Sequence, residues 1–124
     1  MATQPETWVG RFAPPNNECV SLVKAAAGAP QTARWKKGAA VRGNLMVAKG
    51  TAIATFDGTG RYANNPRGNH AAIYVRQDGT GIWVYDQWAE RPKRKAKAVS
   101  ERFIGFRGGQ GSASDDGDAY SVIE

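Results

Sequence analysis

Two periods of apolar and polar residues divide the chain into a helical first part and a β-rich second part. Near the N-terminus, apolar residues recur on one side of a helix that we expect over residues 18–27: Val20, Leu22, Val23 and Ala26. A helix with one apolar side packs that side against another element. The pattern therefore predicts an amphipathic helix close to the start of the chain.

The residues around this helix predict where it begins and ends. Asn16 or Asn17 is suited to cap its N-terminus, because an Asn side chain accepts a hydrogen bond from a first-turn N–H group. Gly28 is typical of the residue at which a helix ends. A short second helix, with Thr32 as its cap, is expected over residues 31–38.

The later part of the chain alternates apolar and polar residues with the period of two that strands show. Turns and loops are expected between the strands: a hairpin turn over 78–81, a polar loop over 61–68 and a flexible Gly-, Ser- and Asp-rich loop over 108–117. Strands are expected over residues 50–56, 69–75, 82–88, 99–107 and 119–123. One or two helices followed by an antiparallel meander predict an α+β domain.

Length and composition limit the class of protein. The 124 residues, 41% of them hydrophobic, suit one domain over residues 1–124 with a single core. No apolar run approaches the roughly 18 residues of a transmembrane helix, so we expect no membrane span. One cysteine and one histidine exclude an intrachain disulfide and a multi-thiolate zinc site, and we expect no metal or other cofactor.

Charge is distributed unevenly along the chain. Residues 1–107 hold all 17 Lys and Arg against 7 acidic side chains, whereas residues 108–124 hold 4 acidic side chains and no basic ones. A basic body attracts polyanions, and a nucleic acid, an acidic cell-wall polymer and an acidic partner protein all meet this condition. We interpret the basic run over 92–97 as a solvated loop rather than a polyanion contact.

The candidate chemistry lies in the rarest functional groups of the chain. Cys19 is predicted in the first helical turn, where the helix dipole and unpaired N–H groups favour a thiolate. His70 opens a strand, and Asp86 lies near the end of the next strand. An imidazole beside a thiolate exchanges a proton with it, and an acceptor on the second ring nitrogen fixes the tautomer. The three residues together indicate nucleophilic catalysis.

The pairing register of the hairpin decides whether His70 and Asp86 lie on the same face of the sheet. If Ala72 faces Asp86, the two side chains point the same way. If Gln77 faces Ile82 across a four-residue loop, they point to opposite faces unless a bulge intervenes. The sequence leaves both registers open.

Two other functions also fit the sequence. A lone cysteine is commonly a small buried residue, which is compatible with a catalytically degenerate domain that has a structural or partner-binding role. A basic body with aromatic strands is compatible with a module that binds single-stranded nucleic acid; the aromatics concerned are Tyr74, Trp83, Tyr85 and Trp88. Their position among Ile and Val favours a core role, and no RNA-recognition motif accompanies them, so nucleic acid is a disfavoured partner.

The order of a helix-borne Cys, a strand-borne His and a polar residue on the following strand resembles papain-like cell-wall hydrolases, the NlpC-type and CHAP amidases. The chain is still more similar to a family of small proteobacterial proteins grouped with type VI secretion amidase effectors. The resemblance runs from about residue 8 to the end and is carried by residues 17–23, 50–56, 70–75, 86–88 and 117–123. It implies a minimal papain-like fold in which the helix that bears the Cys packs on an antiparallel sheet.

By this resemblance, the chain is expected to be a cysteine amidase or endopeptidase that cuts a peptide-stem or cross-link amide of peptidoglycan. Cys19 would be the nucleophile, His70 the general base and then the acid, and Asp86 the orienting residue. The resemblance leans toward the cross-link between D-alanine and diaminopimelate.

The chain departs from the wider superfamily beside the nucleophile. Glu18 stands where NlpC-type enzymes have Asp, and no Gln lies close upstream as in papain. The backbone N–H of Cys19, helped by Asn16 or Asn17, is therefore the expected oxyanion hole.

The resemblance also implies partners and a place of action. The expected partners are peptidoglycan, a secretion apparatus and a cognate immunity protein that protects the producer. The first ten residues lack the basic and apolar regions of a signal peptide. We therefore expect an antibacterial toxin that is made in the cytoplasm and acts in the periplasm of a target bacterium after delivery.

Overall fold

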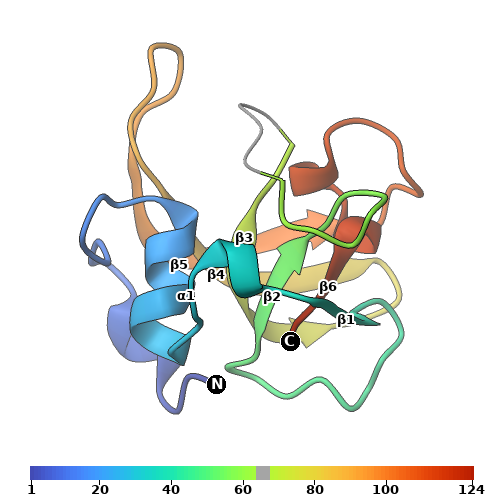
Figure 1. The fold of residues 1–124 in the computed structure, drawn as a ribbon. Coiled ribbons are helices and arrows are strands. Elements are labelled where there is room, and N and C mark those ends of the chain that lie inside the picture. Colours follow the sequence, from blue (N-terminus) through green and yellow to red (C-terminus); the bar gives the residue numbers. More distant parts are fainter. Residues whose placement is uncertain (64–67) are drawn as a thin grey trace.

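The computed structural model describes residues 1–63 and 68–124, and Figure 1 shows their arrangement. Part of the loop predicted over 61–68 falls on residues 64–67, which lie outside the described residues. In the described part, one antiparallel sheet has the strand order β1-β6-β2-β3-β4-β5 and packs against one α-helix, α1. The bounds are α1 Cys19–Ala27, β1 Lys37–Ala40, β2 Ala52–Thr55, β3 Ala71–Gln77, β4 Gly81–Trp88, β5 Lys97–Gly105 and β6 Tyr120–Ile123. The predicted α+β class is confirmed.

The helix lies where the pattern predicts it, but its start is built differently. Its N-cap is Glu18, so the prediction that Asn16 or Asn17 caps the helix is wrong. The reason is a left-handed turn at Asn17 (φ 63°), which separates Asn16 from the cap position. Asn16 still supports the helix start, because its Oδ1 accepts hydrogen bonds from the Glu18 N–H (3.1 Å) and the Ser21 hydroxyl (2.6 Å). The predicted end at Gly28 is confirmed by its left-handed C-cap geometry.

Residues 31–38, all of which the structure describes, do not form the expected second helix, and that prediction is wrong. They contain one 3₁₀ turn, Thr32–Arg34, whose N-cap is Gln31 rather than Thr32, and then enter β1. Trp35 is the one large apolar side chain in this segment, which is too little to stabilise a two-turn helix. The extended chain instead pairs with β6.

All five predicted strands are present, each within a few residues of its expected bounds. Their order is not a simple meander, because the C-terminal strand β6 lies between β1 and β2. In its pairing with β2, Val122 faces Ile53 and Ser121 faces Ala54. The last residues of the chain therefore lie inside the sheet rather than at its edge.

Two apolar clusters cover opposite faces of the sheet. The cluster beneath α1 contains Leu22, Val23, Ile73 and Tyr85, and the other contains Ile53, Ala72, Tyr74, Val84 and Tyr120. Tyr74 and Tyr85 are both buried, and they belong to different clusters. The strand aromatics therefore do not share one exposed face, and the hypothesis of an aromatic nucleic-acid-binding face is wrong.

A bulge in the β3–β4 hairpin sets the register beside the candidate site. Near the turn, Gln77 faces Ile82. If this register continued along the hairpin, His70 and Asp86 would point to opposite faces of the sheet. The pairing shifts by one residue at Val75, so that Tyr74 faces Val84. Beyond this bulge, even-numbered residues of β3 and β4 share a face, and the imidazole and the carboxylate point the same way.

The connection between β4 and β5 forms an arm that projects at the top of Figure 1, drawn in orange. We call residues 89–96 the basic arm. Backbone hydrogen bonds between Arg91 and Arg94 (2.8 and 3.0 Å) close its tip, and residues 90–96 are exposed. No helix in the described residues has the length and apolar character needed to cross a membrane.

Candidate active site

The start of α1 holds Cys19 in the wall of a cleft. Cys19 is the first residue of the helix, so its backbone N–H has no helical carbonyl to bond and the positive end of the helix dipole lies beside it. The side chain is half-buried and lines the cleft. This environment favours a thiolate and leaves the sulfur accessible.

Gln87 of β4 fixes the helix start, a role that the sequence pattern did not indicate. Its fully buried side chain accepts a hydrogen bond from the Ala13 N–H (2.7 Å) and donates to the carbonyls of Ala13 (3.2 Å) and Glu18 (2.8 Å). The amide thereby ties both the entry segment and the residue before the thiol to the sheet. The sequence feature that could have indicated this role is a Gln inside an apolar strand, since a buried amide needs hydrogen-bond partners of this kind.

Hydrogen bonds to Thr55 of β2 position His70 immediately before β3. The His70 N–H donates to the Thr55 hydroxyl (3.0 Å), and its carbonyl accepts from the Thr55 N–H (3.0 Å). The ring is buried, and its Nε2 lies 2.8 Å from Asp86 Oδ2. The ring also lies close enough to Cys19 for its hydrogen bonding and charge to lower the pKa of the thiol, and Nδ1 is the nitrogen that Asp86 leaves free. The structure thus brings together the three predicted residues in the order thiol, imidazole, carboxylate.

Asp86 is fully buried and has two further partners. Its Oδ1 accepts from Lys97 Nζ (2.7 Å) and its Oδ2 from Arg102 Nε (2.8 Å). Burial alone raises the pKa of this carboxyl, but the hydrogen bond and charge of His70, together with the two cations, hold it well below its usual range. Neither cation was predicted; the signal was the buried carboxylate itself, which requires compensating charge.

The pKa values of Cys19 and His70 shift in opposite directions. Burial raises the pKa of the Cys19 thiol, but the hydrogen bond and charge of His70 outweigh burial and leave the pKa below its usual value. Burial lowers the pKa of His70, but hydrogen bonds to Asp86 and Cys19 outweigh it and raise the pKa to about 9. These shifts favour a thiolate–imidazolium ion pair over the neutral pair.

Tyr62 places a hydroxyl beside the thiol, and the sequence pattern did not indicate this contact. Its Oη lies 3.7 Å from Cys19 Sγ and accepts a hydrogen bond from the Asn69 amide (3.3 Å). Burial and the charge of the thiolate raise the pKa of Tyr62 well above its usual value, so the phenol keeps its proton. Since Asn69 donates to the oxygen, the hydroxyl proton is available to the sulfur.

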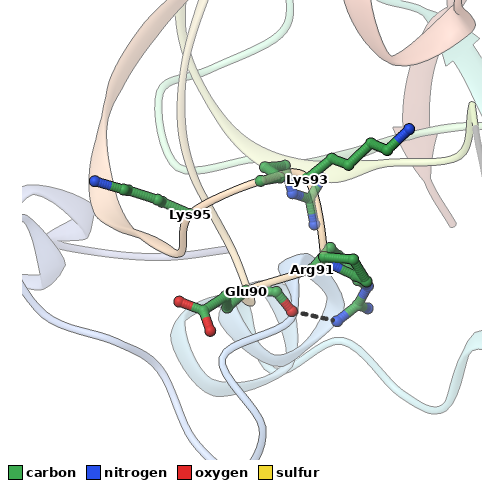
Figure 2. A pocket seen from close by; sticks show the side chains of 6 residues that line it. Glu90, Arg91, Lys93 and Lys95 are labelled. Atoms are coloured by element: carbon green, nitrogen blue, oxygen red, sulfur yellow. Dashed lines mark hydrogen bonds between the residues drawn. The ribbon is translucent and has the colours of Figure 1, made fainter.

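The cleft around Cys19 and His70 has a volume of about 700 Å³. Its lining also includes cations of the basic arm and the residues Ser112, Ser114 and Asp115, but not Asn16 or Asn17, which were expected to assist the oxyanion hole. A second hollow of about 630 Å³ is lined by residues 90–95 alone and contains none of the three candidate residues (Figure 2). Within residues 1–63 and 68–124, no cluster of three or more His, Cys, Asp and Glu is arranged to hold a metal ion.

Asp116 orders the loop that was expected to be flexible. Its buried carboxylate accepts hydrogen bonds from the N–H groups of Arg107 (2.8 Å), Gly109 (2.7 Å) and Asp118 (2.9 Å). These bonds outweigh burial and lower the pKa of the carboxyl. The 3₁₀ turns Ala113–Asp115 and Gly117–Ala119 follow, and the first of them supplies part of the cleft wall.

Known proteins are similar to this chain over nearly all of its length. The profile of the family described as domesticated amidase effector 2 matches residues 1–123. The type VI secretion amidase effector 2 protein of Salmonella typhi is 36% identical over 115 residues, which cover 88% of this chain and 86% of that protein. The domesticated amidase effector 2 of Ixodes scapularis is 40% identical over 111 residues, which cover 86% of this chain and 70% of that protein.

A solved structure agrees with these relatives. The structure of a type 6 secretion amidase effector 2 matches with a TM-score of 0.82 and 34% identity, and the match covers 98% of this chain and 91% of that chain. The resemblance to type VI secretion amidase effectors, expected from the sequence, is confirmed. The chain belongs to the domesticated amidase effector 2 family, which it shares with type VI secretion amidase effector 2 proteins.

Proposed function

We propose that the chain is a cysteine amidase that hydrolyses a peptide amide bond of bacterial peptidoglycan. In this proposal Cys19 is the nucleophile, His70 the general base and acid, and Asp86 the residue that orients the imidazole. The observation that carries it is that Cys19 and His70 line one cleft, and that the buried carboxylate of Asp86 binds the imidazole from behind. Relatives that are named as amidases support the class of bond.

Acylation of the enzyme is the first half of the reaction. The Cys19 thiolate bonds to the carbonyl carbon of the scissile amide, and the electron pair of the C=O bond moves to the oxygen. This oxyanion lies near the free N–H at the start of α1, which favours negative charge. His70 then gives its Nδ1 proton to the amide nitrogen as the C–N bond breaks and the amine leaves.

Hydrolysis of the thioester is the second half. Neutral His70 takes a proton from a water molecule, whose oxygen bonds to the thioester carbonyl carbon. The C–S bond breaks, the thiolate forms again beside the imidazolium, and the carboxylic acid product leaves. Asp86 holds Nε2 throughout and stays ionised because Lys97 and Arg102 bind it.

The names of the relatives agree on an amidase but differ in origin. One is named for type VI secretion and another as domesticated, so family membership does not specify the route of delivery. We infer the bacterial route, in which a secretion apparatus delivers the chain as a toxin to the periplasm of a target bacterium. A cognate immunity protein would protect the producer. The net charge of +6 agrees with a substrate that is rich in carboxylates.

Digestion of purified Gram-negative sacculi tests the activity and identifies the bond. Mass spectrometry of the released muropeptides is expected to show new amine and carboxyl ends at the cross-link between D-alanine and diaminopimelate. Cys19→Ala and His70→Ala should each lower the rate by at least about 1,000-fold, because each removes a reacting group. Unchanged circular dichroism would show that both variants fold, and wild-type cleavage by either would refute the proposed roles.

Expression in a Gram-negative host tests the compartment. With an N-terminal export signal the wild-type protein should lyse the host, while the same protein kept in the cytoplasm and exported Cys19→Ala should not. Equal lysis from the cytoplasm would contradict a periplasmic target.

A further inference from the structure

The basic arm forms a part of the cleft wall that the proposed mechanism does not use. Three of its cations, Arg91, Lys93 and Arg94, line the same cleft as the candidate nucleophile. Figure 2 shows the tip of the arm, where Arg91 and Lys93 lie on one side and Glu90 and Lys95 on the other. Neither Glu90 nor Lys95 lines the cleft. The arm thus has a cleft face and a back face, both of which carry cations.

The cations of the cleft differ in how they are compensated. Arg91 forms an ion pair with Glu18, and Arg102 forms ion pairs with two carboxylates. Among the described residues, no acidic side chain forms an ion pair with Lys93 or Arg94. These two side chains are exposed and present uncompensated positive charge to the cleft.

Contacts at the base of the arm position Arg94 in advance and fix the backbone of the segment that carries Lys93. The Trp88 indole N–H donates to the Lys95 carbonyl (3.0 Å), and Arg94 Nη2 donates to the Ala89 carbonyl (3.2 Å). The Arg94 guanidinium lies 5.3 Å from the centre of the Trp88 ring, which is edge-on to His70 with 6.4 Å between ring centroids. The arm is therefore connected to the candidate catalytic imidazole through one aromatic ring. A pre-positioned group loses less entropy when it binds a ligand.

We propose that Lys93 and Arg94 form a carboxylate-binding subsite, which holds a free carboxylate of the substrate peptide while the neighbouring amide lies over Cys19. This inference deepens the proposed function and rests on it. Ammonium and guanidinium groups bind carboxylates through charge-assisted hydrogen bonds. Glu18 and Asp115 also line the cleft, but each forms an ion pair with an arginine, so uncompensated positive charge in the described part of the cleft is confined to Lys93 and Arg94. Two neighbouring cations suit one carboxylate of a peptide better than the continuous charge of a nucleic acid.

Binding is measured in the Cys19→Ala background, so that no turnover occurs. The probes are cross-linked muropeptides and the same muropeptides with their carboxylates converted to methyl esters. Lys93→Gln is compared with Lys95→Gln, which removes the same charge from the back face of the same arm. We expect Lys93→Gln to weaken binding of the native muropeptides roughly 3- to 10-fold and Lys95→Gln less than about 2-fold. Neither change should alter binding of the esters by more than about 2-fold.

Three results would overturn the subsite. Equal weakening by Lys93→Gln and Lys95→Gln would show a general attraction of charge. Equal weakening for native and esterified muropeptides would show that Lys93 does not act through a carboxylate of the ligand. Binding of a single-stranded oligonucleotide as tightly as native muropeptides, with the same dependence on both lysines, would assign the arm to polyanions in general.

Turnover by the protein with Cys19 intact separates failure of the subsite from failure of the proposed function. Lys93→Gln should raise KM for native muropeptides roughly 3- to 10-fold and leave kcat unchanged, because the contact is made equally in ground and transition states. Cleavage whose KM does not depend on Lys93 would overturn the subsite and leave the function standing. The opposite result is also informative. If the wild type cleaves nothing but binding in the Cys19→Ala background depends on Lys93, the subsite proposal stands and the amidase proposal is wrong.

Discussion

A buried carboxylate controls the protons of the candidate site. Asp86 is held ionised by Lys97, Arg102 and His70, despite the opposing effect of burial. Its hydrogen bond helps to raise the pKa of His70 to about 9, again against burial, and His70 in turn lowers the pKa of Cys19. The reactivity of the sulfur is thus set by a group that does not touch it.

This series of charges predicts a bell-shaped dependence of kcat/KM on pH. On the acid side, protonation of Cys19 removes the nucleophile, and the lowered pKa moves this loss to a lower pH than for an ordinary thiol. On the alkaline side, activity should fall as the pH rises through about 9, where His70 loses the proton that the leaving amine requires. The rate of Cys19 alkylation by iodoacetamide, measured against pH, reports the acid limb without substrate.

Two variants serve as controls for this profile. His70→Ala and Tyr62→Phe should each move the midpoint of alkylation to higher pH, because each removes a hydrogen bond to the sulfur. His70→Ala should have the larger effect, since it also removes a positive charge. An ordinary thiol curve in the wild type, unchanged in His70→Ala, would contradict the ion pair.

The three candidate catalytic residues could be proposed from sequence because each is rare or out of place. Cys19 and His70 are the only residues of their types, and Asp86 interrupts an apolar strand. Lys97 and Arg102 could not be selected in the same way from 17 basic side chains. The pairing of β4 with β5 identifies them, and that pairing depends on contacts that no local pattern contains.

The same contrast holds for the secondary structure. Local periodicity located α1 and five strands, because each has an apolar side to bury. It failed at β1, where pairing with a strand 80 residues later replaces the expected helix. It also left the β3–β4 register open, because the pairing near the turn and the pairing near the site differ by the bulge at Val75.

The Gln87 side chain joins β4 to the start of α1, so we expect Gln87→Met to lower both the free energy of unfolding and the reactivity of the Cys19 thiol. The change leaves the Ala13 N–H and two carbonyls without their partner in a buried position, at a cost of about 2–4 kcal/mol in the free energy of unfolding. Because Glu18 then loses its hydrogen bond to β4, it no longer fixes the Cys19 thiol beside His70. Urea unfolding and iodoacetamide alkylation below the unfolding transition measure the two effects.

Gln77→Met is the matched control for this prediction. The Gln77 amide also bonds backbone groups across the fold, the carbonyls of Val41 (2.8 Å) and Asn44 (3.3 Å) and the N–H of Gly43 (2.8 Å), but at the turn end of β3. It should destabilise the protein and leave thiol reactivity unchanged. Equal alkylation rates for the two variants would contradict a positioning role for Gln87.

The fold joins distant parts of the chain at one cleft. The start of α1, the start of β3, the end of β4 and the loop before β6 all supply lining residues, and β6 itself lies inside the sheet. The α+β class followed from the local pattern, whereas the strand order did not, because it rests on pairings between the two ends of the chain. Disturbing charge at the site should therefore change the stability of the entire fold.

The free energy of unfolding should accordingly depend on pH in two windows. The pKa of His70 is raised by folding, so its contribution is complete below about 6.5 and is lost as the pH rises through about 9. In the wild type the lowered pKa of Cys19 adds a contribution that grows over the same range and offsets this fall, so the His70 window is measured in Cys19→Ala. The pKa of Asp86 is lowered, so its contribution is present above about 4 and is lost as the pH falls. Urea unfolding at a series of pH values measures both.

Asp86→Asn and Asp116→Asn distinguish this linkage from a general effect of buried carboxylates. Asp86→Asn should cost about 3 kcal/mol at neutral pH, because Lys97 and Arg102 lose their partner. In the Cys19→Ala background it should also flatten the alkaline fall, because the hydrogen bond and charge of Asp86 then raise the pKa of His70 without a contribution from Cys19. Asp116→Asn removes another buried carboxylate, one that binds backbone N–H groups, and should keep the alkaline fall. An alkaline fall that survives in Asp86→Asn would show that His70 is not stabilised through Asp86, and the proposed orienting role would fail with it.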